Sequence, residues 1–244
     1  MTRAGTSVWR DWCVRALTFD FWDTLMQQVP ALQLRAAAVA EHLGIEELAV
    51  ARAIEDAFVL HKETWRSGRE FGLKGLVRHL SQQFQVSSPA ELRSVIAAPH
   101  LLSASRPAPH AAEALAELRA AGLRLGIVSD TGFSPGSTLR QLLSEHCLLD
   151  HFEPSALAFS DEVGVPKPAA KIFRVALAGL GTRPEETAHI GDLRFTDVAG
   201  ARALGMITVR YRGCHDDLAG AEADMVVDDL SELPSLLLPA ARGN

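Results

Sequence analysis

An aspartate at the end of a short apolar segment is the residue of this chain best placed to do chemistry. Asp20 follows the run Ala16-Leu17-Thr18-Phe19, whose length and composition predict a buried strand. In open α/β sheets, ligands bind and reacting groups lie just beyond the carboxyl ends of the strands. Asp20 is therefore a candidate nucleophile.

Three further predicted strands also end in polar residues. One ends in Ser129-Asp130-Thr131, the next is followed by Lys167 just before a helix, and the last ends in Gly191-Asp192, with Asp197 five residues further on. Taken singly, each of these residues could be a helix cap or a solvated charge. Parallel strands bring their carboxyl ends to one edge of a sheet, however, so four such ends in succession favour a shared site.

The residue types at these strand ends suit phosphate chemistry. A carboxylate can attack phosphorus and form an acyl phosphate. Two or three carboxylates can hold Mg²⁺, which prefers oxygen ligands and keeps part of its water shell. A hydroxyl and an ammonium group can bind phosphoryl oxygens and offset developing negative charge. The four strand ends together therefore predict metal-assisted phosphoryl transfer.

The elements that position these residues follow from the hydrophobic pattern. From about residue 106 onward, apolar strands alternate with helical segments. This alternation predicts a parallel sheet with helices on both faces, a Rossmann-like α/β fold. Within it, Ser134 is expected to cap a helix over residues 135–146, and Pro168 to lie in the first turn of a helix over residues 168–181.

A second composition separates the first strand from the rest of this sheet. Between about residues 31 and 96 the chain is rich in Ala, Leu, Glu, Gln and Arg, with apolar residues at helical spacing and no strand-like alternation. This pattern predicts three or four helices. We therefore expect a catalytic core of residues 1–25 and 105–244, and an all-helical cap of residues 26–104 inserted into it.

Composition limits the partners that we expect. The chain has 244 residues, 48% of them hydrophobic, and a net charge of −6 without a basic run. A nucleic-acid surface needs clustered Lys and Arg, and a membrane span needs a longer apolar stretch than any here, so neither partner is expected. A small anionic substrate is compatible with this charge. The oligomeric state is left open.

The N-terminus and the cysteines bear on the cellular compartment. Residues 1–13 lack the apolar core of a signal peptide, which predicts a cytoplasmic protein. Cys13, Cys147 and Cys214 are few and scattered, and no metal-ligand spacing links them. We expect them to be reduced thiols.

The chain resembles the haloacid dehalogenase superfamily of hydrolases, in the branch with a helical cap inserted after the first motif. The matching motifs are Phe19-Asp20-Phe21-Trp22-Asp23-Thr24-Leu25, Ile127-Val128-Ser129-Asp130, Gly164-Val165-Pro166-Lys167-Pro168, and the segment from His189 through Asp192 and Asp197 to Met206. The resemblance covers the core, from about residue 15 to 25 and from about 106 to 230, and is weak within the cap. It is specific for the superfamily and says little about the substrate.

This resemblance implies a metal site and a nucleophile. It makes Asp20 both the nucleophile and a Mg²⁺ ligand. The main-chain carbonyl of Trp22 would be a second ligand, which a residue of any type can supply. Asp192 would bind the ion, and Asp197 would hold it directly or through water.

The same resemblance implies residues that bind the substrate. Ser129 would hydrogen-bond the transferring phosphoryl group, and Lys167 would neutralise charge between that group and the nucleophile. The remaining candidate substrate-binding residues are Thr24, which steadies the loop after the nucleophile, Asp130, and two cap residues, Arg66 and Arg69. The polar stretch around the two arginines also fits a solvated helix end.

Position 22 departs from the pattern of the family's phosphatases. These enzymes carry an aspartate two residues after the nucleophile, which protonates the leaving alcohol and then activates water. The indole N–H of Trp22 is only a donor and does not titrate near neutrality, and the loss of a positioned acid–base group typically costs ~10²–10⁴ in rate. Asp23 or a cap residue could replace it, although adjacent residues of an extended chain point to opposite sides.

Four functions remain open, of which a carbon–halogen hydrolase and a carbon–phosphorus hydrolase together rank second. A Mg²⁺-dependent phosphatase that acts on a small phosphorylated metabolite through an aspartyl phosphate ranks first, because Asp192 and Asp197 match the metal-dependent members of the superfamily. The 2-haloacid dehalogenases carry an aromatic residue at the position of Trp22. The phosphonatases use a cap lysine, for which Lys62 and Lys74 are the candidates. A phosphate-compound-binding protein with little turnover is the non-enzyme alternative.

Overall fold

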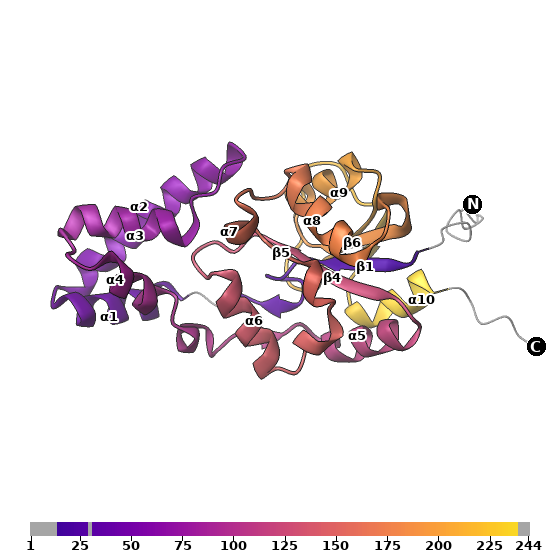
Figure 1. Ribbon diagram of the computed structural model, residues 1–244, viewed down its shortest axis with the longest axis horizontal. Coiled ribbons are helices and arrows are strands. Elements are labelled where there is room, and N and C mark those ends of the chain that lie inside the picture. Colours follow the sequence, from indigo (N-terminus) through magenta and orange to yellow (C-terminus); the bar gives the residue numbers. More distant parts are fainter. Residues whose placement is uncertain (1–13, 29–30, 239–244) are drawn as a thin grey trace, which may run out of the picture.

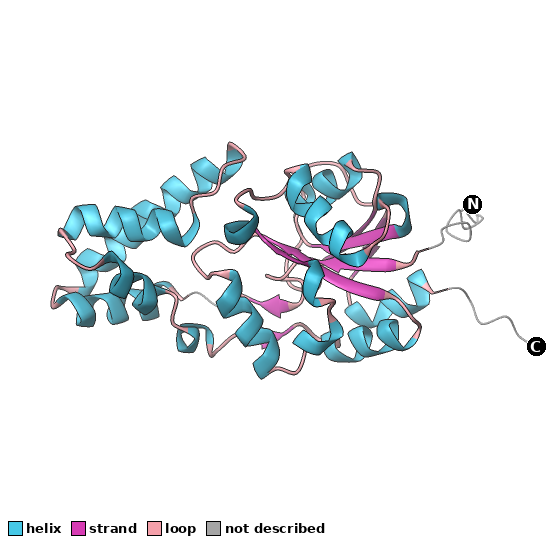
Figure 2. Cartoon of the chain, in the orientation of Figure 1, coloured by secondary structure: helices cyan, strands magenta, loops and turns pink. Residues whose placement is uncertain are grey.

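A parallel sheet forms the centre of the computed structural model, which describes residues 14–28 and 31–238. Within these residues, six parallel strands run in the order β5-β4-β1-β6-β7-β8 (Figure 2). Their bounds are β1 (Ala16–Phe19), β4 (Arg124–Ser129), β5 (Leu157–Phe159), β6 (Thr187–Gly191), β7 (Ile207–Tyr211) and β8 (Met225–Val227). The predicted α/β fold is confirmed. Residues 1–13, on which the cytoplasmic prediction rests, lie outside the described residues, and so does Cys13.

Helices cover both faces of this sheet (Figure 1). The helices of the core are α5 (Ala111–Ala120), α6 (Gly136–Glu145), α7 (Ser160–Val163), α8 (Ala170–Leu180), α9 (Ala199–Ala203) and α10 (Leu233–Leu237). Adjacent residues of β4 enter different cores: Ile127 packs with Leu115 of α5, and Val128 packs with Ile172 of α8. Burial on both faces explains why the parallel strands read as continuous apolar runs in the sequence.

Four helices between the first and second strands of this sheet form a separate lobe, at the left of Figure 1. They are α1 (Leu32–Leu43), α2 (Glu47–Arg66), α3 (Gly72–Phe84) and α4 (Pro89–Ile96). The lobe joins the core through an antiparallel pair, β2 (Met26–Gln27) and β3 (Arg106–Pro107). It has its own hydrophobic cluster, and one residue of the core, Phe133, is buried in that cluster. We call this lobe the cap; its limits at residues 26 and 104 stay a prediction.

Short single turns complete the chain. They are η2 (Pro99–Leu102), η3 (Leu149–His151), η4 (Pro154–Ala156), η5 (Pro184–Glu186) and η7 (Leu230–Glu232), together with a π-helical turn, η6 (Arg194–Val198). None of the helices in residues 14–28 and 31–238 is long and apolar enough to span a membrane.

Two predicted helix starts are wrong. Helix α6 begins at Gly136 with Pro135 as its N-cap, because the hydroxyl of Ser134 instead accepts a hydrogen bond of 2.6 Å from Nη2 of Arg35 in the cap. Helix α8 begins at Ala170, and Pro168 lies in the preceding turn, which the N–H of Ala169 closes onto the carbonyl of Pro166. The two helices thus start one and two residues later than predicted.

Candidate active site

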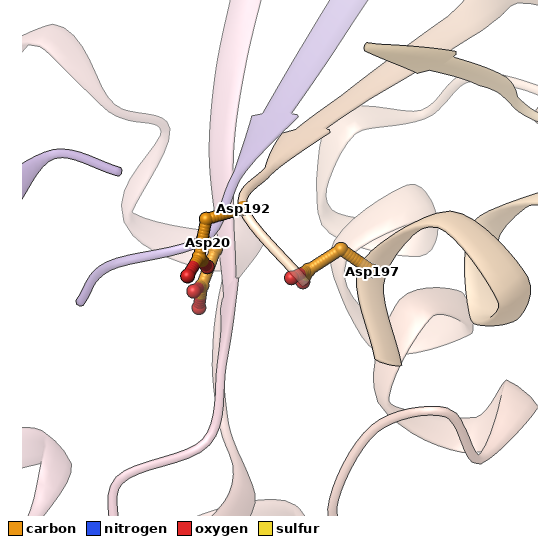
Figure 3. A group of neighbouring side chains, drawn as sticks. All are labelled: Asp20, Asp192 and Asp197. Carbon is orange, nitrogen blue, oxygen red and sulfur yellow. The ribbon is translucent and has the colours of Figure 1, made fainter. Parts of the chain in front are cut away.

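Three carboxylates meet at the carboxyl edge of the sheet. Asp20 directly follows β1, and its N–H donates to the carbonyl of Ile190 in the neighbouring strand β6 at 2.8 Å. Asp192 directly follows β6, and Asp197 comes from the π-helical turn η6. One carboxylate oxygen of each aspartate lies within 4.8 Å of the others, and all three side chains are buried (Figure 3).

A buried ammonium group joins two of these carboxylates. Nζ of Lys167, from the turn between α7 and α8, lies 2.6 Å from Oδ1 of Asp20 and 2.6 Å from Oδ1 of Asp197. Burial alone would lower the pKa of Lys167, but the attraction of Asp197 and Asp20 outweighs burial and raises that pKa. Lys167 therefore stays protonated, as one positive charge against three carboxylates.

Asp197 is fully partnered by the protein itself. Its Oδ1 also accepts from Nε2 of His189 at 3.1 Å, and its Oδ2 accepts from the N–H of Leu193 at 3.0 Å. Burial opposes ionisation, but Lys167 and His189 outweigh it and lower the pKa of Asp197 to about 2. The carboxylate can only accept, so Nε2 of His189 donates, and in a neutral imidazole Nδ1 accepts from the Thr18 hydroxyl at 2.9 Å.

Asp192 is the carboxylate without a partner. No side chain or loop N–H of the described residues donates a hydrogen bond to it, although it is only 4% exposed. Burial, followed by repulsion from Asp197 and Asp20, raises the pKa of Asp192 to about 9. A carboxyl group in this setting is stabilised either by a proton or by a nearby cation.

A divalent cation fits this donor set. Three buried carboxyl groups share one ammonium, so the two whose pKa values are raised, Asp20 and Asp192, ionise more readily when a cation is bound. Oxygen donors are the ligands that Mg²⁺ prefers. The loop after Asp20 also offers a carbonyl oxygen that could bind a metal ion. Its backbone hydrogen bonds use the carbonyls of Phe21 and Met26 as acceptors, and none of the described loop bonds uses the carbonyl of Trp22. The residues present would therefore accept an ion between Asp20, Asp192 and the Trp22 carbonyl, with Asp197 in support.

A glycine allows the third aspartate to approach. A Cβ atom added at Gly191 would lie 2.3 Å from Cγ of Asp197, too close for any side chain. Only a glycine at position 191 therefore leaves room for the carboxylate of Asp197 beside the end of β6.

The second strand end also reaches the site and connects it to the cap. Ser129 is buried at the end of β4, and its hydroxyl has one weak contact, 3.3 Å to the carbonyl of Asp130. Oδ1 of Asp130 accepts from the N–H of Lys167 at 2.9 Å, and Oδ2 accepts from Nε1 of Trp65 in α2 at 2.8 Å. Burial raises the pKa of Asp130 to about 7, despite the nearby Lys167. Asp130 thus joins the β4 end, the lysine turn and the cap.

Within the described part of the chain, three other predicted site residues make no hydrogen bond or ion pair with the carboxyl groups of this cluster. Thr24 is buried, and its hydroxyl has no hydrogen-bond partner among the described residues. Arg66 and Arg69 are exposed at the end of α2 and beyond it, and Nε of Arg69 donates to Ser67. The structure does not bring either arginine to the carboxylates, and their role in substrate binding stays a prediction.

The structure also shows the contacts of Trp22, which departs from the family pattern, and of Asp23, a candidate replacement for the missing acid. The ring of Trp22 packs edge-to-face on Phe21, with 4.7 Å between ring centroids. Asp23 has a left-handed backbone, with φ of 54°, and its Oδ1 accepts from the N–H of Gln28 at 3.0 Å. That contact holds the Asp23 carboxylate to its own loop.

Four residues of this region were missed by sequence reasoning. They are Thr18, Trp65, His189 and Phe195. Thr18 and His189 sit inside buried strands, where they read as ordinary core residues. Trp65 offered a signal, because it is a large aromatic residue within an otherwise polar helix end.

Comparison with known proteins assigns the family. The model of the haloacid dehalogenase-like hydrolases matches residues 14–205. The chain belongs to this family. A relative from Bos taurus, haloacid dehalogenase-like hydrolase domain-containing protein 3, is 30% identical over 245 residues, which cover 93% of each chain.

Other relatives carry names of phosphatases. The glyceraldehyde 3-phosphate phosphatase of Methanocaldococcus jannaschii is 35% identical over 134 residues, 54% of this chain and 57% of the relative, so the match spans little more than half of that enzyme. The phosphoglycolate phosphatase of Chromobacterium violaceum is 27% identical over 243 residues, 92% of this chain and 96% of the relative. A HAD phosphatase structure from Thermococcus onnurineus shares the fold, with a TM-score of 0.70, 24% identity, and coverage of 92% of this chain and 98% of that one.

Proposed function

We propose that this protein is a Mg²⁺-dependent phosphatase that acts on a small phosphorylated metabolite through an aspartyl phosphate on Asp20. The observation that carries the proposal is the pairing of Asp20, which contacts Lys167, with Asp192, a buried carboxylate that lacks a partner. Metal-assisted phosphoryl transfer uses a nucleophile, a positive charge held near it, and an acidic residue that can bind a metal ion. Asp20, Lys167 and Asp192 match these three roles. The names of the relatives, which include phosphatases of glyceraldehyde 3-phosphate and phosphoglycolate, support the substrate class.

The side chains divide the reaction between them. An oxygen of Asp20 attacks phosphorus, and the leaving oxygen departs with the electron pair of the P–O bond. Lys167 holds Asp20 in place and offsets charge on the phosphoryl group, and the Ser129 hydroxyl donates a hydrogen bond to a phosphoryl oxygen. Mg²⁺, when bound, supplies further charge compensation to the phosphoryl oxygens. Water then hydrolyses the aspartyl phosphate and regenerates Asp20.

Trp22 favours a second candidate, a 2-haloacid dehalogenase-like hydrolase. The 2-haloacid dehalogenases carry an aromatic residue at this position. A halide leaves as an anion, so its displacement from carbon needs no acid to protonate the leaving group. Asp192 weighs against it, because a halide displacement has no use for a buried cluster of three carboxylates. A phosphonatase-like reaction has less support, because Lys62 is exposed and its Nζ lies over the ring of Phe58, 4.5 Å from the ring centroid.

An activity screen with the purified full chain tests the proposal. Phosphate esters, acyl phosphates, phosphonates and 2-haloacids would be assayed with Mg²⁺ and with a chelator. We expect release of phosphate from esters and acyl phosphates that stops on chelation. Release of halide that is indifferent to chelation would instead identify a dehalogenase. Binding of phosphate compounds without turnover would leave the binding-protein alternative.

A further inference from the structure

A tryptophan of the cap is hydrogen-bonded to a residue at the carboxyl edge of the sheet. Trp65 lies in the last turn of α2, and its Nε1 donates to Oδ2 of Asp130 at 2.8 Å. The other oxygen of Asp130 accepts from the N–H of Lys167, whose Nζ contacts Asp20. These contacts link the indole of the cap, through Asp130 and Lys167, to the proposed nucleophile.

A phenylalanine of the core faces that indole. Phe195 lies in η6, between the proposed metal ligands Asp192 and Asp197, and its ring centroid is 6.4 Å from that of Trp65, at an interplanar angle of 75°. Phe195 is 51% exposed, whereas the next two residues, Thr196 and Asp197, are buried. The two rings therefore form an aromatic pair that is partly open to solvent and continuous with the segment that carries Asp192 and Asp197.

The one hydrogen-bonding side-chain atom of this ring pair is already used. Nε1 of Trp65 donates to Asp130, and Arg66 and Arg69 are exposed residues at the end of α2 and beyond it. A leaving group with several hydroxyls would find no donor on this ring pair. A planar ring, in contrast, can stack on or meet edge-on either aromatic side chain.

The chemistry at position 22 favours the same class of substrate. Trp22 cannot protonate a leaving group, so unless another residue supplies the proton the leaving oxygen departs as an anion. A phenol, with a pKa near that of a tyrosine side chain at ~10, leaves as an anion far more readily than an alkanol. The aromatic ring pair and the missing acid at position 22 therefore favour the same kind of substrate, one with an aryl leaving group.

We propose that Trp65 and Phe195 together receive a planar aromatic leaving group, so that the preferred substrates are aryl phosphate esters. The inference rests on the proposed phosphatase function and narrows it. Asp20 forms a bond to phosphorus as the bond from phosphorus to the aryl oxygen breaks. The electron pair leaves on the aryl oxygen, which takes its proton from water.

Binding of two matched phosphonates tests the ring recognition without turnover. Benzylphosphonate and cyclohexylmethylphosphonate have similar size and charge but differ in aromaticity. We expect the full chain with Mg²⁺ to bind benzylphosphonate about 3–10-fold more tightly in calorimetry, the range of an aromatic pair. Trp65→Leu and Phe195→Leu should each reduce this ratio toward one. Trp65→Phe keeps a ring and should retain most of the preference.

A second aromatic residue of the same helix provides the control. Phe58 is also about half exposed on α2, two turns before Trp65. Phe58→Leu should leave the ratio of the two affinities as it is in the wild type. Circular dichroism of each variant would show whether the cap is still folded.

The outcomes separate this inference from the proposed function. Equal affinities in the wild type, or a preference that survives both leucine substitutions, would overturn the ring pair even if the protein hydrolyses phosphate esters. A preference that depends on Trp65 and Phe195 would support it even if no ester is turned over, and only the phosphatase function would then fail. Failure to bind either phosphonate would overturn the ring pair as well.

Discussion

The two regions that meet at Asp130 use opposite chemistry. The edge of the core presents three carboxyl groups and an ammonium group, which contacts two of them. The end of α2 in the cap presents an aromatic ring whose single polar atom is bonded to Asp130. In our proposal the core therefore carries out the reaction of the phosphoryl group, and the cap contacts the rest of the substrate.

The same contrast extends to how the two regions are attached. Besides the β2–β3 pair, the cap is joined to the core by Phe133, which is buried among cap residues, and by the hydrogen bonds of Trp65 and Arg35. These contacts come from residues 130–134, which follow β4, and the hydroxyl of Thr138 in α6 adds a hydrogen bond of 2.9 Å to the carbonyl of Ala97 in the cap. The loop that carries one part of the catalytic edge thus also positions the cap.

The largest effect is expected at the core. Asp20→Asn removes the nucleophile and one metal ligand while it keeps the size of the side chain. We expect turnover of any phosphate ester to fall by roughly 10⁴-fold or more, because a lost nucleophile removes the covalent pathway. Steady-state phosphate release measures this. A phosphoryl group trapped on a different residue would contradict the assignment of Asp20.

The next effect concerns the metal. Asp192→Asn should weaken binding of Mg²⁺ by about 100-fold or more, because loss of a carboxylate ligand costs at least as much as loss of an outer-shell partner. Asp150→Asn, at an exposed turn, is the matched control and should bind the ion as the wild type does. Calorimetric titration of the ion measures both. Equal affinity in Asp192→Asn and wild type would show that the ion, if bound, lies elsewhere.

The sheet and most of its catalytic edge could be predicted because their signals are local. A buried parallel strand reads as a short apolar run, and the polar residue that follows it marks the edge of the sheet. Asp20, Lys167, Asp192 and Asp197 are brought together as the strand ends predicted. His189 could not be assigned, because its partner Thr18 lies 171 residues away in the sequence.

The cap side of the site depends on long-range packing. Consecutive residues of a helix differ by about 100° in direction, so the turn that holds Trp65 toward the core leaves Arg66 directed elsewhere. The partner of Trp65 is Asp130, 65 residues further on, and α2 packs against α1 and α3 through Val50, Ala53, Ile54 and Ala57. Composition identified the polar stretch but could not say which of its residues faces the core.

Restoring a carboxylate at position 22 sharpens the contrast between reaction and recognition. Trp22→Asp supplies an acid where the leaving group departs, so turnover of an alkyl phosphate should rise by up to about 100-fold, and that of an aryl phosphate by much less. The ratio of the two rates is the measurement. Trp22→Phe is the control, since it loses the indole without gaining a carboxylate. An unchanged ratio in a folded Trp22→Asp variant would mean that another residue already supplies the proton.

The smallest effect lies where the two regions touch, at Asp130. Burial raises the pKa of this carboxyl group from 3.8 to about 7, so the folded state holds its proton more tightly than the unfolded state. The linkage then makes stability fall as pH rises from about 4 to about 7. Asp130→Asn removes the titration, so the free energy of unfolding of the wild type should decline relative to the variant by on the order of 2 kcal/mol between pH 5 and pH 8. Urea unfolding at both pH values measures this, with the exposed cap residue Asp56 changed to Asn as the control. Parallel curves for wild type and Asp130→Asn would show that the carboxyl group beside Trp65 stays ionised throughout, and that the core meets the cap through a permanent charge.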